Sequence, residues 1–188
     1  MYEIGSYFCH QLASRTFFDG KMPLCSRCTG IYIGMVIGFI CYLLFCRFKT
    51  FDKISLVLVA ITGLVPILLD GGSQYLGFRL SNNLLRYSTG ILFGAFILIF
   101  ILSFSIYTLK SYSILSDKIL FVVLAIMFLC GYLSYTFIVS GYSLFISIFS
   151  VLSIIGLFLS IISGYLFIIS STWILLSYFY RRCYLEKK

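Results

Sequence analysis

The residues best suited to chemistry lie near the start of the chain, where three of its seven cysteines and its single histidine occur together. Cys25 and Cys28 form a C-x-x-C pair, and Cys9 and His10 stand about fifteen residues before it. A C-x-x-C turn can place both thiolates on one ion, and a structural zinc takes four sulfur or nitrogen ligands. The spacing therefore predicts a metal centre for zinc, or another thiolate-binding metal, with Cys9, His10, Cys25 and Cys28 as ligands.

The same pair of thiols is typical of a second chemistry. A C-x-x-C pair at the start of a helix has a lowered thiol pKa, and thiol oxidoreductases use this arrangement. In that case Cys25 and Cys28 would form the redox pair, and Cys9 could resolve the intermediate. A metal or disulfide that only ties down a surface segment is a further alternative. The spacing leaves these alternatives open.

Arginines and polar side chains predict a site for an anion. Arginine binds phosphate and carboxylate groups through two parallel hydrogen bonds, and free N–H groups at helix N-termini favour the same anions. The alternative is a set of interfacial arginines that bind lipid headgroups without selectivity. The residues expected to line the anion site are Gln11, Arg15, Arg27, Gln74, Asn82, Asn83, Arg86 and Thr89.

Asp70 is the charged residue with the least expected position. It ends the apolar run VPILLD and precedes two glycines. A carboxylate at the boundary of a membrane needs a partner. Arg79 or Arg86 could neutralise it as a structural pair, or it could act as a general base, a metal ligand or a proton carrier. Asp70 is therefore the candidate catalytic residue.

The composition of the chain indicates the class of fold in which these residues are placed. The chain has 188 residues, of which 61% are hydrophobic and 11% charged. A soluble domain has about 45–50% apolar and about 25% charged residues, so we expect an integral membrane protein, an all-α polytopic bundle of transmembrane helices. The net charge of +8 fits basic loops that face lipid headgroups on the cytoplasmic side better than it fits nucleic acid.

The apolar runs divide a single membrane domain, residues 1–188, into three parts. These are a polar Cys/His-containing segment 1–28, a three-helix region 29–109 with a polar loop 70–86, and charge-poor C-terminal helices in 110–188. The helices of the middle part are expected at 29–46, 54–69 and 87–109.

The number of helices depends on the last part of the chain. Residues 119–180 carry no charge, and the tripeptide Ser-Gly-Tyr occurs twice there, at 140–142 and 163–165. Two turns at these sites would give six helices in all, which the repetition favours, and one turn would give five. Because the first helix leaves one membrane face and the second returns to it, the loop 70–86 must share a face with segment 9–28.

The helix count also decides the orientation. Each face carries five lysine and arginine residues before the C-terminal tail adds four more. Positive residues concentrate on the cytoplasmic side. Six helices would place the tail beside the cysteine segment and make that face cytoplasmic, whereas five would place the cysteine segment outside.

A short internal repeat accompanies these elements. TGIYIG at 29–34 matches TGILFG at 89–94, and an arginine precedes each of them. The match suggests a duplicated two-helix unit related by an axis along the membrane normal, although so short a match can also arise by chance. Gly30, Gly34 and Gly38 form overlapping G-x-x-x-G patterns, which allow a neighbouring helix to approach closely.

The combined motifs CHQ, CSRCTGIYIG, DGGSQ and LLRYSTG resemble an uncharacterised family of small polytopic membrane proteins, known as domain of unknown function 2085. The resemblance covers about half of the chain, residues 9–94, and implies no activity. The residues to which it points are Cys9, His10, Gln11, Arg15, Cys25, Arg27, Cys28, Thr29, Gly30, Asp70, Gly71, Gln74, Arg86, Thr89 and Gly90.

Three hypotheses of function follow from the sequence. The first is a membrane protein with a Cys/His metal site beside an arginine-lined pocket, which acts on or transports an anionic lipid-linked or small-molecule ligand. The second is a membrane thiol-disulfide oxidoreductase. The third is a non-enzymatic substrate-binding or assembly subunit of a membrane complex. The residues do not choose between enzyme and transporter, and a homo-oligomer or a membrane partner fits each hypothesis.

Overall fold

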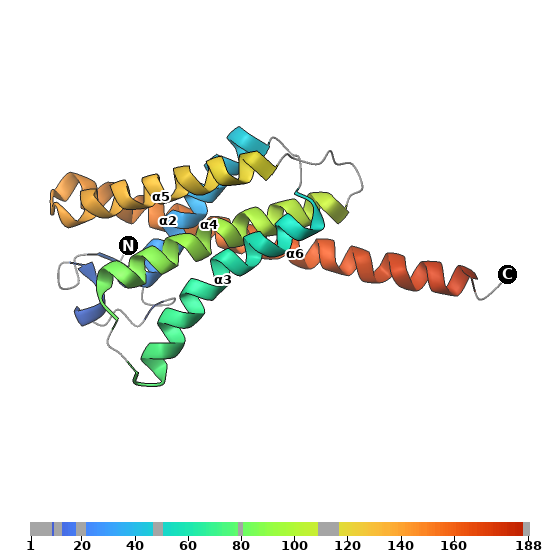
Figure 1. Cartoon of the computed structure of the whole chain (residues 1–188), viewed down its shortest axis with the longest axis horizontal. Helices are drawn as coiled ribbons and strands as arrows, with labels where there is room; N and C mark the ends of the chain where they lie inside the picture. The colour runs from blue at the N-terminus through green and yellow to red at the C-terminus, as the bar shows by residue number, and fades with distance from the viewer. Residues whose placement is uncertain are drawn as a thin grey trace.

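The computed structural model is a bundle of α-helices with no β-strand in the part of the chain that it describes (Figure 1). The described residues are 9, 13–17, 22–46, 51–78, 81–108 and 117–185. The elements are a 3₁₀ turn Ala13–Arg15, α2 Ser26–Cys41 with a π-helical turn Tyr42–Cys46, α3 Lys53–Tyr75, α4 Asn83–Thr108, α5 Asp117–Val139 and α6 Ser143–Leu185.

Four of the described helices are long and apolar enough to cross a membrane, as the composition predicts. They contribute the candidate spans Ser26–Phe45, Ile54–Tyr75, Asn83–Tyr107 and Ser143–Tyr178. The fifth helix, α5, contains a shorter apolar stretch, Ala125–Val139. At a rise of 1.5 Å per residue, the 23 residues of α5 extend over about 34 Å, which is close to the thickness of a bilayer.

Helices α2 and α4 form the centre of the bundle and run in the same direction. Along α2, Gly30, Gly34 and Gly38 face successive turns of α4, at Tyr87, Ile91 and Ala95 respectively. A Cβ at any of the three would overlap a backbone carbonyl oxygen of α4. The glycines therefore permit the two backbones to approach closely, as the G-x-x-x-G pattern predicts. We call the end of the bundle at which α2 and α4 begin the cysteine face.

The contacts between α2 and α4 follow a two-fold pattern with an offset of 60 residues. Gly30 faces the carbonyl of Tyr87, while Gly90 faces the carbonyl of Arg27. In the same way Gly34 meets Ile91 and Gly94 meets Ile31. Adding 60 to the α2 residue of one contact and subtracting 60 from its α4 residue gives the two residues of the counterpart contact. Parallel helices related in this way fit a two-fold axis along the membrane normal, as the repeated TGxxxG segments suggest.

The two-fold relation extends to side chains on α3 and α5. Arg27 Nη2 donates to Gln74 Oε1 at 3.4 Å, and Tyr87 Oη donates to Ser134 Oγ at 2.8 Å. These two contacts also differ by 60 in both residue numbers. The pattern supports a duplicated two-helix unit. In the first copy this side-chain contact contains a charged arginine, and in the second copy both side chains are neutral.

The second helix is longer than the sequence predicts. A turn was expected at Asp70 and the two glycines after it, but α3 continues through them and ends at Tyr75. The chain turns instead at Gly77, which has a φ of 74° that favours glycine. Asp70 consequently lies inside α3 and not in a loop. Its side chain is held against the bundle.

Residues 117–185, the described C-terminal part, contain two helices, so the five-helix alternative describes the structure. The first Ser-Gly-Tyr forms a turn, with Gly141 at a φ of 76°, whereas the second lies inside α6. Gly164 has no atom within 4 Å of its Cβ position, so nothing there forces a bend. The candidate span of α6 contains 36 residues and extends about 54 Å, longer than the bilayer core. Its C-terminal half projects beyond the bundle (Figure 1).

Candidate metal centre and anion site

The start of α2 is fastened to the segment that precedes it. Thr16 and Cys25 form an isolated antiparallel bridge, and the hydroxyl of Ser26 donates to the Arg15 carbonyl at 2.9 Å. Asn83, at the start of α4, donates to the Thr16 carbonyl at 3.3 Å. These bonds hold the chain before α2 across the N-termini of the two central helices.

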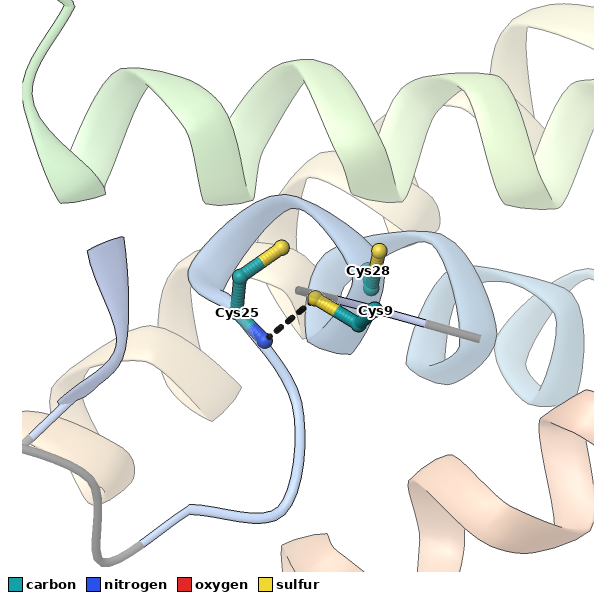
Figure 2. A group of neighbouring side chains, drawn as sticks. All are labelled: Cys9, Cys25 and Cys28. Atoms are coloured by element: carbon teal, nitrogen blue, oxygen red, sulfur yellow. Dashed lines mark hydrogen bonds between the residues drawn. The ribbon is translucent and has the colours of Figure 1, made fainter. Parts of the chain in front are cut away.

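Cys9, Cys25 and Cys28 meet at this point (Figure 2). Their three sulfur atoms all lie within 4.8 Å of one another. Cys25 is the N-cap residue of α2, and its backbone N–H donates to Cys9 Sγ at 3.4 Å. Cys28 follows one turn later, because α2 begins at Ser26 and not at Thr29 as the sequence predicts. All three thiols are free and partly buried.

The environment of Cys25 stabilises its thiolate. A hydrogen bond from the Cys28 side chain is the largest of the effects that lower the pKa of Cys25 to about 5. Backbone N–H groups of Cys28 and Arg27 and the Cys9 thiol act in the same direction, and burial opposes them. A thiolate is the form that binds a metal.

The three sulfurs are close enough to hold one metal ion. A zinc–sulfur bond is about 2.3 Å long, so two thiolates on one tetrahedral zinc stand about 3.8 Å apart. Sulfur atoms within 4.8 Å of one another need only small side-chain movements to reach this spacing. The fourth predicted ligand, His10, lies outside the described residues.

A polar network connects α2 with α3 beside the cysteines. Arg27, which lies between Cys25 and Cys28 in the sequence, forms an ion pair with Asp70 at 2.5 Å. The other carboxylate oxygen of Asp70 accepts a hydrogen bond from Ser81 Oγ at 2.6 Å. Asp70 is 1% exposed. The structural-pair alternative for Asp70 is therefore realised with Arg27, whereas the sequence suggested Arg79 or Arg86.

Arg86 lies on α4 at the same face. Its side chain is buried, and its Nη1 donates to Asn83 Oδ1 at 3.4 Å. The charges of Arg15, Arg27 and Asp70 all act on it. The structure thus gathers three of the four arginines that the sequence proposes for this face; the fourth, Arg79, lies outside the described residues.

The remaining predicted anion-site residues have local roles or lie outside the description. Asn82 is exposed and caps α4 by accepting from the Leu85 N–H at 2.8 Å. Thr89 is buried, and its hydroxyl donates to carbonyls of its own helix. Gln11 lies outside the described residues. Among the described residues, neither Asn82 nor Thr89 forms a hydrogen bond with the Arg27–Asp70 pair.

Two contributions to the site were missed by sequence reasoning. Ser26 and Thr16 hold the segment before α2 in place, and neither is among the predicted site residues. Beneath them, Phe17, Tyr87 and Tyr135 pack their rings with centroids 5.7–6.2 Å apart. The apolar character of Phe17 within a polar segment was the one available signal that this segment packs onto the bundle.

Comparison with known proteins agrees with the motifs. The family described as "Predicted membrane protein (DUF2085)" matches residues 9–100, which include the cysteine cluster, α2, α3 and most of α4. No solved structure matches the chain.

Two archaeal proteins, both described as uncharacterized, are similar to this chain. One from Methanocaldococcus jannaschii is 38% identical over 104 residues, covering 54% of this chain and 66% of its own length. One from Methanothermobacter thermautotrophicus is 42% identical over 88 residues, covering 45% of this chain and 76% of its own length. Together with the match over residues 9–100, these similarities show that the chain belongs to the family of predicted membrane proteins described as DUF2085.

Proposed function

We propose that this membrane protein holds a thiolate-binding metal ion, with zinc as the first choice, at Cys9, Cys25 and Cys28, beside an arginine-rich site for an anionic ligand. The observation that carries the proposal is the convergence of three sulfur atoms within 4.8 Å of one another. Cys9 lies 16 residues before Cys25, so local helix geometry does not account for its approach to the Cys25 and Cys28 sulfurs. Soft thiolate ligands favour zinc over magnesium or calcium.

His10 is the proposed fourth ligand, because it directly follows Cys9 in the sequence. If a water or a ligand group takes this position instead, the metal can act as a Lewis acid. The chain's own residues would then divide the other tasks. Arg27 and Arg86 would hold the anion, and Asp70 would keep the Arg27 guanidinium in place.

A catalytic role for Asp70 remains a prediction. Both of its oxygens are engaged, by Arg27 and by Ser81, and a general base needs a free lone pair within reach of the proton. These contacts favour positioning over proton transfer. An anionic lipid-linked or small-molecule ligand fits the site in either case, whether the protein transports the ligand or converts it.

Cobalt substitution tests the metal proposal with a spectroscopic readout. Purified full-length protein, stripped of metal and loaded with Co²⁺, should show intense thiolate-to-cobalt absorption bands. Cys25→Ser and Cys28→Ser should each weaken these bands, whereas Cys130→Ser on α5 should leave them unchanged. Absence of the bands in the wild-type chain, with its thiols reduced, would reject the metal centre.

The same geometry supports thiol–disulfide exchange as a second candidate function. Cys25 and Cys28 lie one helical turn apart and Cys9 lies beside them, so a dithiol and a third thiol share one site. Oxidation of Cys25 and Cys28 to a disulfide would release two electrons and two protons, which would reduce a substrate disulfide to two thiols. A metal-free protein that contains a reversible Cys25–Cys28 disulfide would favour this function over the metal centre.

The five helices support a proposal for the orientation of the protein in the membrane. The prediction of a cytoplasmic cysteine face required six helices, and with five the C-terminal end of α6 lies at the opposite end of the bundle from Cys25 (Figure 1). The opposite face then carries nine lysines and arginines against five. Because positive residues concentrate in the cytoplasm, we propose that the cysteine face lies outside.

A further inference from the structure

Arg86 is a buried arginine whose hydrogen bonds are incomplete among the described residues. It is 8% exposed, and its Nε has no hydrogen-bond partner in that part of the chain. Its bond to Asn83 is long, at 3.4 Å. The Nε of Arg27 is likewise buried without a described partner. A guanidinium cannot be deprotonated in a protein, so neither arginine can become neutral to relieve its burial.

The nearby charges do not balance these arginines. Arg15 and Arg27 repel Arg86, and Asp70 attracts it, but Asp70 is already bound by Arg27. Arg15 is exposed to solvent, whereas Arg86 is buried and forms no ion pair among the described residues. Buried charge without compensation is strongly unfavourable, so the site is suited to an anion.

We propose, building on the anion site of the proposed function, that Arg86 and Arg27 together bind a phosphate group. A phosphate has enough oxygens to accept from two guanidinium groups at once, and arginine matches its geometry with paired hydrogen bonds. Arg27 lies in the first turn of α2, where the positive end of the helix dipole favours an anion.

The position of the two arginines relative to the membrane surface is compatible with two sources of phosphate. Arg27 is the second residue of the span Ser26–Phe45, and Arg86 is the fourth residue of the span Asn83–Tyr107. Residues in the first turn of a spanning helix lie near the level of the lipid headgroups. The phosphate can therefore belong to a membrane lipid or to a soluble phosphorylated compound, and the chemistry of recognition is the same.

The test uses the full-length chain in a glycosidic detergent that contains no phosphorus. Phosphorus per chain is measured first, to detect a retained lipid. The unfolding temperature is then recorded in titrations of inorganic phosphate, short-chain phosphatidic acid, and succinate at matched ionic strength. Phosphate or phosphatidic acid should raise the unfolding temperature of the wild type, whereas succinate should not. Stabilisation at a lower concentration by phosphatidic acid, or retained phosphorus, assigns the group to a lipid; stabilisation by phosphate alone assigns it to a soluble compound.

Variants at Arg86 make the assignment specific. Arg86→Lys keeps the charge but loses the paired geometry, and it should weaken phosphate binding by about tenfold or more. Arg86→Gln should abolish the response and the retained phosphorus, and Lys53→Gln at the opposite end of the bundle should change neither. An unchanged response in Arg86→Gln, or equal stabilisation by succinate and phosphate, overturns the phosphate assignment.

Metal content, measured on the same samples, separates this inference from the metal proposal. Arg86→Gln should keep the metal content of the wild type, which also shows that the variant is folded. A wild-type chain that contains the metal but shows no phosphate response would overturn only the phosphate site. A phosphate response in a metal-free wild-type chain would support the phosphate site and overturn the metal centre.

Discussion

Arg27 on α2 and Asp70 on α3 form a partly buried ion pair across 43 positions of sequence, at the face where the cysteines meet. The pair joins the two most polar segments of the chain, and Gln74 and Ser81 extend it. Arg27 lies between Cys25 and Cys28, so the ion pair and two of the thiols are held at the start of the same helix. The thiol cluster and the charged network therefore lie beside each other at the cysteine face.

Removing the charge of Asp70 should destabilise the protein. In Asp70→Asn the guanidinium of Arg27 would lose its only described carboxylate partner, and breaking a buried pair costs about 3–5 kcal/mol. Because the Arg27 side chain is 27% exposed, we expect the lower end, about 3 kcal/mol. The measurement is the unfolding temperature in detergent, together with a double-mutant cycle that adds Arg27→Gln.

Asp52 provides the matched control for this substitution. It caps α3 at the other end of the bundle, where it accepts from the Ser55 N–H at 3.1 Å. Asparagine caps helices nearly as well as aspartate, so Asp52→Asn should have little effect. Equal unfolding temperatures for Asp70→Asn and the wild type would show that the ion pair does not stabilise the fold.

The close approach of α2 and α4 predicts a strong response at Gly94. A Cβ there would overlap the Ile31 carbonyl, so Gly94→Leu must push the two helices apart. Overpacking costs about 1–3 kcal/mol where side chains can adjust, and we expect at least this loss because backbone is in the way. Gly164→Ala on α6, where nothing lies within 4 Å, should instead be neutral or slightly stabilising. Similar unfolding temperatures for both variants would argue against the packing of the central helices.

Tyr87 should contribute to stability but not to metal binding. Tyr87→Phe removes the 2.8 Å bond to Ser134 Oγ, and Ser134 keeps its own bond to the Gly131 carbonyl at 2.8 Å. A lost hydrogen bond of this kind costs about 1 kcal/mol. Thermal unfolding and metal content of the variant, compared with the wild type, check both parts. Loss of metal in Tyr87→Phe would mean that the neutral half of the repeat also supports the cysteine cluster.

The fold class and the presence of a close neighbour on the first spanning helix were accessible from sequence because they depend on local patterns. Apolar runs of membrane-spanning length gave the helical bundle, and the glycine spacing at Gly30, Gly34 and Gly38 indicated a close neighbour. The turn after α3 was misplaced because Asp70 and the glycines after it resemble a loop in isolation. Contacts of Asp70 with Arg27 and Ser81 outweigh that local preference and keep the segment helical.

The candidate site was only partly accessible for a similar reason. The C-x-x-C spacing identified Cys25 and Cys28, and helix parity placed Asp70 on their face. Which arginine pairs with Asp70 depends on helix rotation and on side-chain reach, and neither is encoded in a short motif. The second Ser-Gly-Tyr was read as a turn because serine and glycine are turn formers, although membrane helices also tolerate them.

The proposed orientation has a direct test at the two ends of the bundle. Ser14 is exposed at the cysteine face, so Ser14→Cys should add a thiol that an impermeant reagent labels in intact cells. A C-terminal tag should become accessible to protease only after lysis. Protection of the Ser14→Cys thiol until lysis would place the cysteine face inside. Accessibility of both sites on one side would mean that α6 divides at Ser163–Gly164 in the bilayer.

The central claim is that the three thiols hold a metal ion, and elemental analysis of the purified full-length chain tests it most directly. We expect about one zinc, or one equivalent of another thiolate-binding metal, per chain. Cys9→Ser, Cys25→Ser and Cys28→Ser should each lose most of it, and Cys130→Ser should retain it. A wild-type chain that is purified with reduced thiols and contains no metal, even after incubation with zinc, would contradict the account.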